Sequence, residues 1–178
     1  MNSAETKNLI IAAKNGDAKA FSELYELYFV PVYRYIYFRV KQKEEAEDLT
    51  QAVFMKVYSA VSRYEDVGKP PLAYFYSIAR NAVIDYWRRH KRVVILETAQ
   101  LEQVGDRATN LEADMAARRD VEMVLQGLKK LTEEQAEIIT LKFINDLSTR
   151  EIAELLGKSE DAVRQIQHRA LEKLRVIL

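Results

Sequence analysis

The sequence of 178 residues predicts an all-α fold of two small helical domains joined by a linker. Apolar residues recur at helical spacing through most of the chain, whereas the alternation typical of a half-buried strand is hard to find. Only five glycines and three prolines interrupt this pattern, so long helices can form. The length suits one large or two small domains.

The first forty residues predict a helical bundle. Residues 4–14 form an amphipathic helix that ends near Gly16, and Asp17 is placed to cap a second helix. Pro31 is expected either to open a new turn or to kink that helix. The aromatic run over residues 32–38 is interpreted as a buried helix, because the segments on both sides are helical.

Residues 43–63 predict a strong helix whose acidic start suits the positive end of the helix macrodipole. Its inward stripe is expected to contain Ala46, Leu49, Val53, Val57 and Ala60. Its outer face is expected to carry Glu47, Asp48, Gln51 and Phe54. An exposed aromatic ring beside carboxylates is typical of a partner-binding helix. The alternative is a solvated acidic face.

Residues 64–71 contain Gly68 and two prolines and predict a loop before a basic helix over residues 72–92. The outward positions of that helix are Tyr74, Arg80, Asn81, Ile84, Trp87 and Arg88. Rings interleaved with cations suit single-stranded DNA, because bases stack on rings and phosphates meet cations. An unpaired base could also be held in a pocket. The alternative is that the tyrosines belong to the core.

Residues 147–178 predict a helix-turn-helix. Ser148 and Glu151 have the spacing of a capping box, Gly157 supplies the turn, and Ser159 caps the second helix. The inward stripe of that helix is expected to be Val163, Ile166, Ala170, Leu174 and Ile177. The opposite face carries Arg164, Gln165, His168, Arg169 and Arg175. Such a face suits base edges and phosphates in a major groove; an ordinary three-helix core with solvated charges is the alternative.

Charge is distributed unevenly, although the net charge is zero. Residues 51–92 hold eight basic and three acidic residues, whereas residues 93–122 hold three and seven. This asymmetry indicates a phosphate-facing surface followed by a linker that avoids DNA.

Several classes of function are not expected. The chain has no cysteine, and His90 and His168 do not form a ligand cluster, so no metal or cofactor is predicted. The absence of a glycine-rich phosphate loop and of a nucleophile–base pair argues against an enzyme. The amino terminus does not resemble a signal peptide and no apolar run approaches a membrane span, which predicts a cytoplasmic protein.

Four segments taken together resemble the bacterial sigma-70 family, specifically its short, two-domain extracytoplasmic-function type (ECF, group IV). They are residues 15–28, 44–58, 78–92 and 131–175. The resemblance implies a sigma factor that binds core RNA polymerase and directs promoter recognition, −10 melting and transcription initiation. It also implies a region 2 helical bundle over residues 1–92, an acidic flexible linker over 93–115 and a region 4 helix-turn-helix domain over 116–178.

The resemblance assigns roles to individual residues of this chain. Core polymerase, through the clamp helices of its largest subunit, would be bound by Glu47, Asp48, Gln51 and Phe54. Single-stranded −10 DNA would be bound by Tyr74, Arg80, Asn81, Trp87 and Arg88, with Asp85 in the same helix. The −35 element would be read in the major groove by Ser159, Arg164, Gln165, His168 and Arg169.

The chain departs from the family pattern at two places. Tyr74 stands where the family often has tryptophan, which leaves less stacking area. In the −35 helix Ile166 precedes Gln167, where the family usually shows a basic residue followed by an apolar one.

The family type also implies an anti-sigma factor as a partner, which would hold this otherwise cytoplasmic protein at the membrane. Two other classes of function remain open. A self-sufficient helix-turn-helix regulator would use the same carboxy-terminal module as a dimer on paired half-sites. A sigma-like interaction protein would bind polymerase without using promoters.

Overall fold

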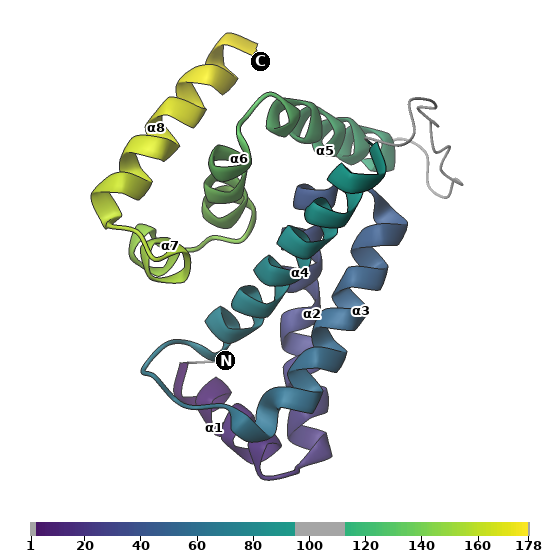
Figure 1. Cartoon of the computed structure of the whole chain (residues 1–178), viewed down its shortest axis with the longest axis vertical. Helices are drawn as coiled ribbons and strands as arrows, with labels where there is room; N and C mark the ends of the chain where they lie inside the picture. Colours follow the sequence, from purple (N-terminus) through teal and green to yellow (C-terminus); the bar gives the residue numbers. More distant parts are fainter. Residues whose placement is uncertain (1–2, 95–112, 178) are drawn as a thin grey trace.

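The computed structural model describes residues 3–94 and 113–177, and every regular element in these two ranges is helical. The amino-terminal bundle contains α1 (Ser3–Lys14), α2 (Ala18–Val40), α3 (Lys43–Ala60), the short 3₁₀ turn η1 (Val61–Arg63) and α4 (Pro71–Val94). The carboxy-terminal domain contains α5 (Ala113–Lys129), α6 (Glu133–Ile139), the π-helical turn η2 (Thr140–Ile144), α7 (Thr149–Leu156) and α8 (Glu160–Ile177). Figure 1 shows both groups of helices. The predicted all-α fold is confirmed.

The longest helix of the amino-terminal bundle core is α4, and α2 lies beside both α3 and α4. Asp17 caps α2 by accepting hydrogen bonds from the backbone N–H groups of Lys19 and Ala20, as predicted. The expectation that Pro31 opens a new turn is wrong, because α2 continues through this position to Val40. Buried side chains before and after the proline pack into the core, so tertiary contacts hold the helix together where one backbone donor is missing.

The predicted exposure of Phe54 is also wrong. Its side chain is 4% exposed and lies in the core of the bundle. Its ring centroid is 4.7 Å from that of Tyr25 and 5.5 Å from that of Phe75. Because α3 packs against both α2 and α4, two adjacent rows of its side chains are buried. A single 3.6-residue stripe describes only one of these rows.

The local signals of the helix-turn-helix are confirmed. Ser148 and Glu151 form a reciprocal capping box at the start of α7. Gly157 ends α7 in the left-handed conformation, with φ of 66°. Val163 and Ala170 of the predicted inward stripe of α8 are fully buried, and Ile166 and Leu174 are half-buried. The side chain of Ile177 lies outside the described residues.

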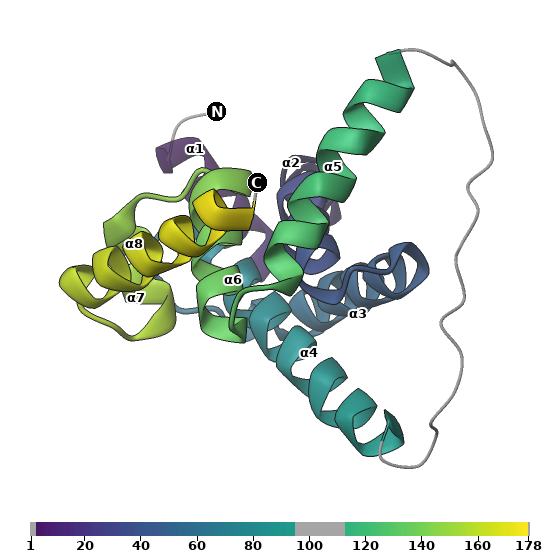
Figure 2. The ribbon, with the colours of Figure 1, turned by 90° about the horizontal axis from the view of Figure 1, so that it is seen from above.

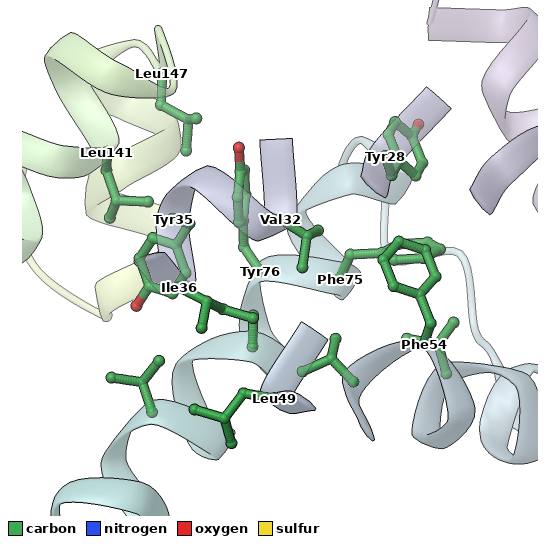
Figure 3. Packing of buried hydrophobic residues seen from close by; sticks show 14 of the residues in the cluster. Tyr28, Val32, Tyr35, Ile36, Leu49, Phe54, Phe75, Tyr76, Leu141 and Leu147 are labelled. Carbon is green, nitrogen blue, oxygen red and sulfur yellow. The ribbon is translucent and has the colours of Figure 1, made fainter. Parts of the chain in front are cut away.

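The two domains are docked on each other through a continuous apolar core. Figure 3 shows Leu141 and Leu147 of the carboxy-terminal domain beside Tyr35 and Tyr76 of the bundle. On the other side of the contact, Phe38 packs on the small core of the carboxy-terminal domain. Figure 2 shows α6 lying between the bundle and the pair formed by α7 and α8. The acidic linker expected at 93–115 falls mostly on residues 95–112, outside the described residues.

Candidate nucleic-acid interface

The outer face of α8 presents the side chains predicted to read duplex DNA. Arg164, Gln165, His168 and Arg169 are all exposed. Arg164 is held by two acidic side chains of its own helix, at 3.2 Å from Glu160 and 2.9 Å from Asp161. The hydrogen bond to Asp161 raises the pKa of the guanidinium, a group that is charged in proteins in any case. The face is open to a ligand and carries fixed positive charge.

Ser159 lies at the start of this face and stabilises the amino-terminal end of α8. Its hydroxyl oxygen accepts a hydrogen bond from the backbone N–H of Ala162 at 3.1 Å, which caps α8 as predicted. Further along, His168 Nδ1 lies 3.6 Å from a carboxylate oxygen of Glu172. When protonated, His168 can form an ion pair with Glu172, which lies one turn further along α8.

The predicted single-strand surface on α4 is only partly open. Asn81 and Arg88 are exposed, and Arg88 forms an ion pair with Asp85 at 3.0 Å. Tyr74 and Trp87 are half-buried, because their rings make edge contacts with Tyr64 and Tyr86 at 5.2 Å in each case. Part of each ring remains available for stacking.

Arg80 does not lie on an open surface in this conformation. Its Nε lies 3.0 Å from Glu137 Oε1, on α6 of the other domain. The side chain of Arg80 is 34% exposed and that of Glu137 is 9% exposed. The docked carboxy-terminal domain therefore occupies the guanidinium that was predicted to meet DNA.

The outer face of α3 differs from its prediction in its aromatic member. Glu47, Asp48 and Gln51 are exposed as predicted, whereas Phe54 is buried. The large hydrophobic side chains that this helix exposes are Met55 and Tyr58, at 73% and 61% exposure. Met55 lies four residues after Gln51 and seven after Asp48, on the same side of the helix. That spacing was visible in the sequence, but the prediction favoured an aromatic ring over a methionine.

Within the described ranges, no group of three His, Cys, Asp or Glu side chains is placed to hold a metal ion. The same part of the chain contains no helix long and apolar enough to cross a membrane.

Comparison with known proteins places this geometry in a family. Residues 24–93 match the family described as Sigma-70 region 2, and residues 127–176 match Sigma-70, region 4. The first match contains α3 and most of α2 and α4, and the second contains α6, α7 and nearly all of α8. The class of protein is therefore a sigma-70 family factor.

Curated relatives narrow the class. The ECF RNA polymerase sigma factor BldN of Streptomyces coelicolor is 32% identical over 99% of this chain and 67% of its own length. SigM of Bacillus subtilis is 30% identical over 87% of this chain and 93% of its own. The chain belongs to the ECF group of RNA polymerase sigma factors, and the curated relatives that it matches are sigma factors and not enzymes.

Solved structures share the fold. CnrH in complex with the cytosolic domain of CnrY aligns with a TM-score of 0.74 and 24% identity, covering 95% of this chain and 94% of that one. The sigma factor RpoE of Bartonella quintana, in complex with the anti-sigma factor NepR, aligns with a TM-score of 0.73 and 21% identity, covering 89% and 96%.

Proposed function

We propose that this ECF sigma factor divides promoter recognition between its two domains, as residues 1–92 and 116–178 joined by residues 93–115. Core RNA polymerase supplies the chemistry and most of the affinity, and the sigma factor supplies the sequence preference. The observation that carries the proposal is the exposed basic face of a firmly capped α8, in a chain that belongs to the ECF group.

The −35 element is read by α8 in the major groove. Arg164 and Arg169 offer guanidinium groups, which form paired hydrogen bonds with guanine, and Gln165 offers an amide suited to adenine. His168 lies on the same exposed face. Ser159 fixes the start of the helix and so positions these groups.

The −10 element is opened and held by α4. Arg80, Asn81 and Arg88 meet phosphates and base edges of the separated strand, while Tyr74 and Trp87 offer ring surface for stacking. Unstacking a base costs a few kcal/mol, which contacts to the extruded base must offset. The Nε of Arg80 becomes available to DNA only after Glu137 of the carboxy-terminal domain has moved away from it.

Core polymerase is bound by the outer face of α3. The exposed acidic residues Glu47 and Asp48 suit a basic partner, and Gln51 adds hydrogen-bonding capacity. Met55 provides the apolar contact that Phe54 does not offer, since methionine adapts its shape to a partner. The clamp helices of the largest subunit are the surface that this face would meet.

An anti-sigma factor is the remaining proposed partner. CnrH and the Bartonella RpoE each appear in a complex with a second protein. A protein that binds both domains would hide α4 and α8 together. If that protein were anchored in a membrane, it would hold this otherwise cytoplasmic sigma factor there.

Run-off transcription tests the function directly. Core polymerase with and without the protein would be supplied with a library of genomic fragments from the host. Discrete start sites that share a −35 and −10 pair are expected only when the protein is present. Binding to core polymerase without transcripts would favour the interaction protein. Binding to DNA alone as a dimer would favour the self-sufficient regulator.

A further inference from the structure

A small set of polar contacts joins the two domains. Glu137 on α6 accepts a hydrogen bond from the Tyr35 hydroxyl at 2.9 Å and an ion-pair contact from Arg80 at 3.0 Å, both to the same oxygen. Asn145 Nδ2 donates to the Pro31 carbonyl at 2.7 Å and to the Tyr76 hydroxyl oxygen at 2.8 Å. Figure 3 shows Tyr35 and Tyr76 facing the carboxy-terminal domain.

Glu137 is the central member of this set. Its carboxylate is almost completely buried, and Tyr35 is fully buried beside it. A buried carboxylate is tolerated only where donors compensate for lost water, and here both donors come from the amino-terminal domain. When the domains separate, the carboxylate regains water while the contact disappears. Glu137 is therefore buried and hydrogen-bonded when the domains are docked, and hydrated when they are apart.

The group that Glu137 engages is also one that the proposed function needs. A guanidinium binds a carboxylate and a phosphate by the same geometry, with charge-assisted N–H donors. Glu137 thus occupies on Arg80 the position that a DNA phosphate would occupy in an open complex. A phosphate that accepts a hydrogen bond from Arg80 Nε must therefore displace Glu137 from that nitrogen.

We propose that Glu137 is an internal latch that mimics DNA, keeping the free sigma factor closed with Arg80 withheld from the −10 strand. The role of Arg80 in this proposal rests on the proposed function; the closed state itself does not. The surface that α6 and η2 present is, in this view, a binding site for the protein's own α2 and α4. Polymerase or DNA must displace it.

The interface is built to open as well as to close. Arg39 and Asn145 both form hydrogen bonds across this contact. Among the described residues, the buried atoms Arg39 Nε and Asn145 Oδ1 have no hydrogen-bond partner. Each loses contact with water in the closed state without a compensating bond, which lowers the net stability of docking. A closed state with such unpaired groups can be reversed by a competing anion on Arg80.

The test is the distance between the domains in the full chain. The sequence has no cysteine, so Lys56→Cys on α3 and Lys173→Cys on α8 supply two exposed labelling sites. Pulsed electron spin resonance of this pair should give a single narrow distance distribution in the parent. Adding Glu137→Gln should broaden this distribution, because the domains then sample more than one arrangement. Tyr35→Phe, which keeps the ring and removes the hydroxyl, should broaden it as well.

Glu134→Gln is the matched control. Glu134 lies on the same helix but pairs with Lys158 within its own domain, so its variant should leave the distribution unchanged. Unchanged far-ultraviolet circular dichroism would show that the variants keep their helices. Identical distributions for the parent and both latch variants would overturn the proposal, as would a broad distribution in the parent.

A second readout concerns Arg80. Binding of a fluorescent single-stranded oligonucleotide to the full chain should tighten by about tenfold in Glu137→Gln, because the apparent affinity is reduced by the closed fraction. If Glu137→Gln broadened the distance distribution but did not tighten oligonucleotide binding, Glu137 would not be shielding Arg80 from DNA. The distance measurement needs neither polymerase nor a promoter. It therefore tests the closed state even if the run-off experiment fails, and the run-off experiment tests promoter use even if the domains prove not to be closed.

Discussion

At Arg164, two acidic side chains compete with DNA for one guanidinium. Glu160 and Asp161 hold the group against the helix in the free protein. Contact with a base edge requires at least one of these exposed ion pairs to break. Such pairs contribute little to stability, so the exchange is easy. The acidic residues keep the side chain extended along α8 until DNA is met.

Arg164→Ala is expected to weaken preference for the −35 element by roughly tenfold or more, because a paired guanidinium contact with guanine is lost. Binding to core polymerase should be unchanged, since the face of α3 is untouched. Run-off transcription on promoters with intact and scrambled −35 elements measures the preference. Arg119→Ala, an exposed arginine of α5, is the control. Joint loss of polymerase binding would contradict the assignment.

Phe54 and Met55 are neighbours with opposite surroundings, and this gives a matched pair of variants. Phe54→Ala should lower the free energy of unfolding by about 3–5 kcal/mol, because it leaves a cavity among aromatic rings. Met55→Ala should leave stability unchanged and weaken polymerase binding by about tenfold. Denaturant unfolding and a polymerase affinity measurement separate the two effects. If Met55→Ala and the parent bound polymerase with equal affinity, Met55 would not belong to the polymerase-binding face of α3.

At the scale of elements, the turn between α7 and α8 sets the direction of the reading helix. Gly157 adopts φ of 66°, and a Cβ added there would meet nothing within 4 Å. The cost of a side chain is therefore conformational and not steric. Gly157→Ala should lower the free energy of unfolding by about 1–2 kcal/mol. Gly157→Asn should lose less, because asparagine tolerates this region. Chemical denaturation compares them, and equal stability of all three proteins would contradict the explanation.

Most elements could be predicted because their signals are local. The caps at Asp17 and Ser148 and the turn at Gly157 depend on residues within a few positions of each other. The burial of Phe54 and the continuation of the helix through Pro31 could not be predicted, since both depend on what packs against the helix. One helix covered on two sides buries a wider band than its periodicity indicates. The roles given to the site residues stay predictions.

At the scale of the whole molecule, the domain contact was beyond sequence reasoning. Tyr35 and Glu137 are separated by 102 positions, and nothing in the neighbourhood of either residue identifies the other. The helical segments on both sides indicated a buried helix over residues 32–38 but not which element would cover it. Glu137 in turn looks like one more charge on an acidic helix. Only the docked fold brings the two together.

The buried hydroxyl groups of Tyr35 and Tyr76 predict that the stability of the folded protein depends on pH. Burial raises the pKa of Tyr35 well above its ordinary value of about 10, and burial also raises the pKa of Tyr76. Both are protonated in every state below that value, so their contribution to stability is fully present there. Above about pH 10 the unfolded chain releases these protons and the folded one does not, so stability falls by up to about 1.4 kcal/mol per pH unit for each tyrosine.

Thermal unfolding at pH 8 and pH 10.5 measures this loss. In the double variant Tyr35→Phe with Tyr76→Phe, the decrease between these two pH values should be smaller than in the parent. The other tyrosines are retained and serve as the internal control. A double variant that loses as much stability as the parent would show that these two groups do not carry the effect.

The apolar core that continues from the bundle into α6, η2 and α7 also bears on how long a molecule survives in the cell. Leu141 and Leu147 are buried in the docked arrangement, where they lie beside Tyr35 and Tyr76 of the bundle. A molecule that opens without meeting polymerase presents these side chains, and a more loosely held backbone, to proteases. Because degradation by such a route follows the open population, docking would set the lifetime of idle copies, and engagement by polymerase would lengthen it.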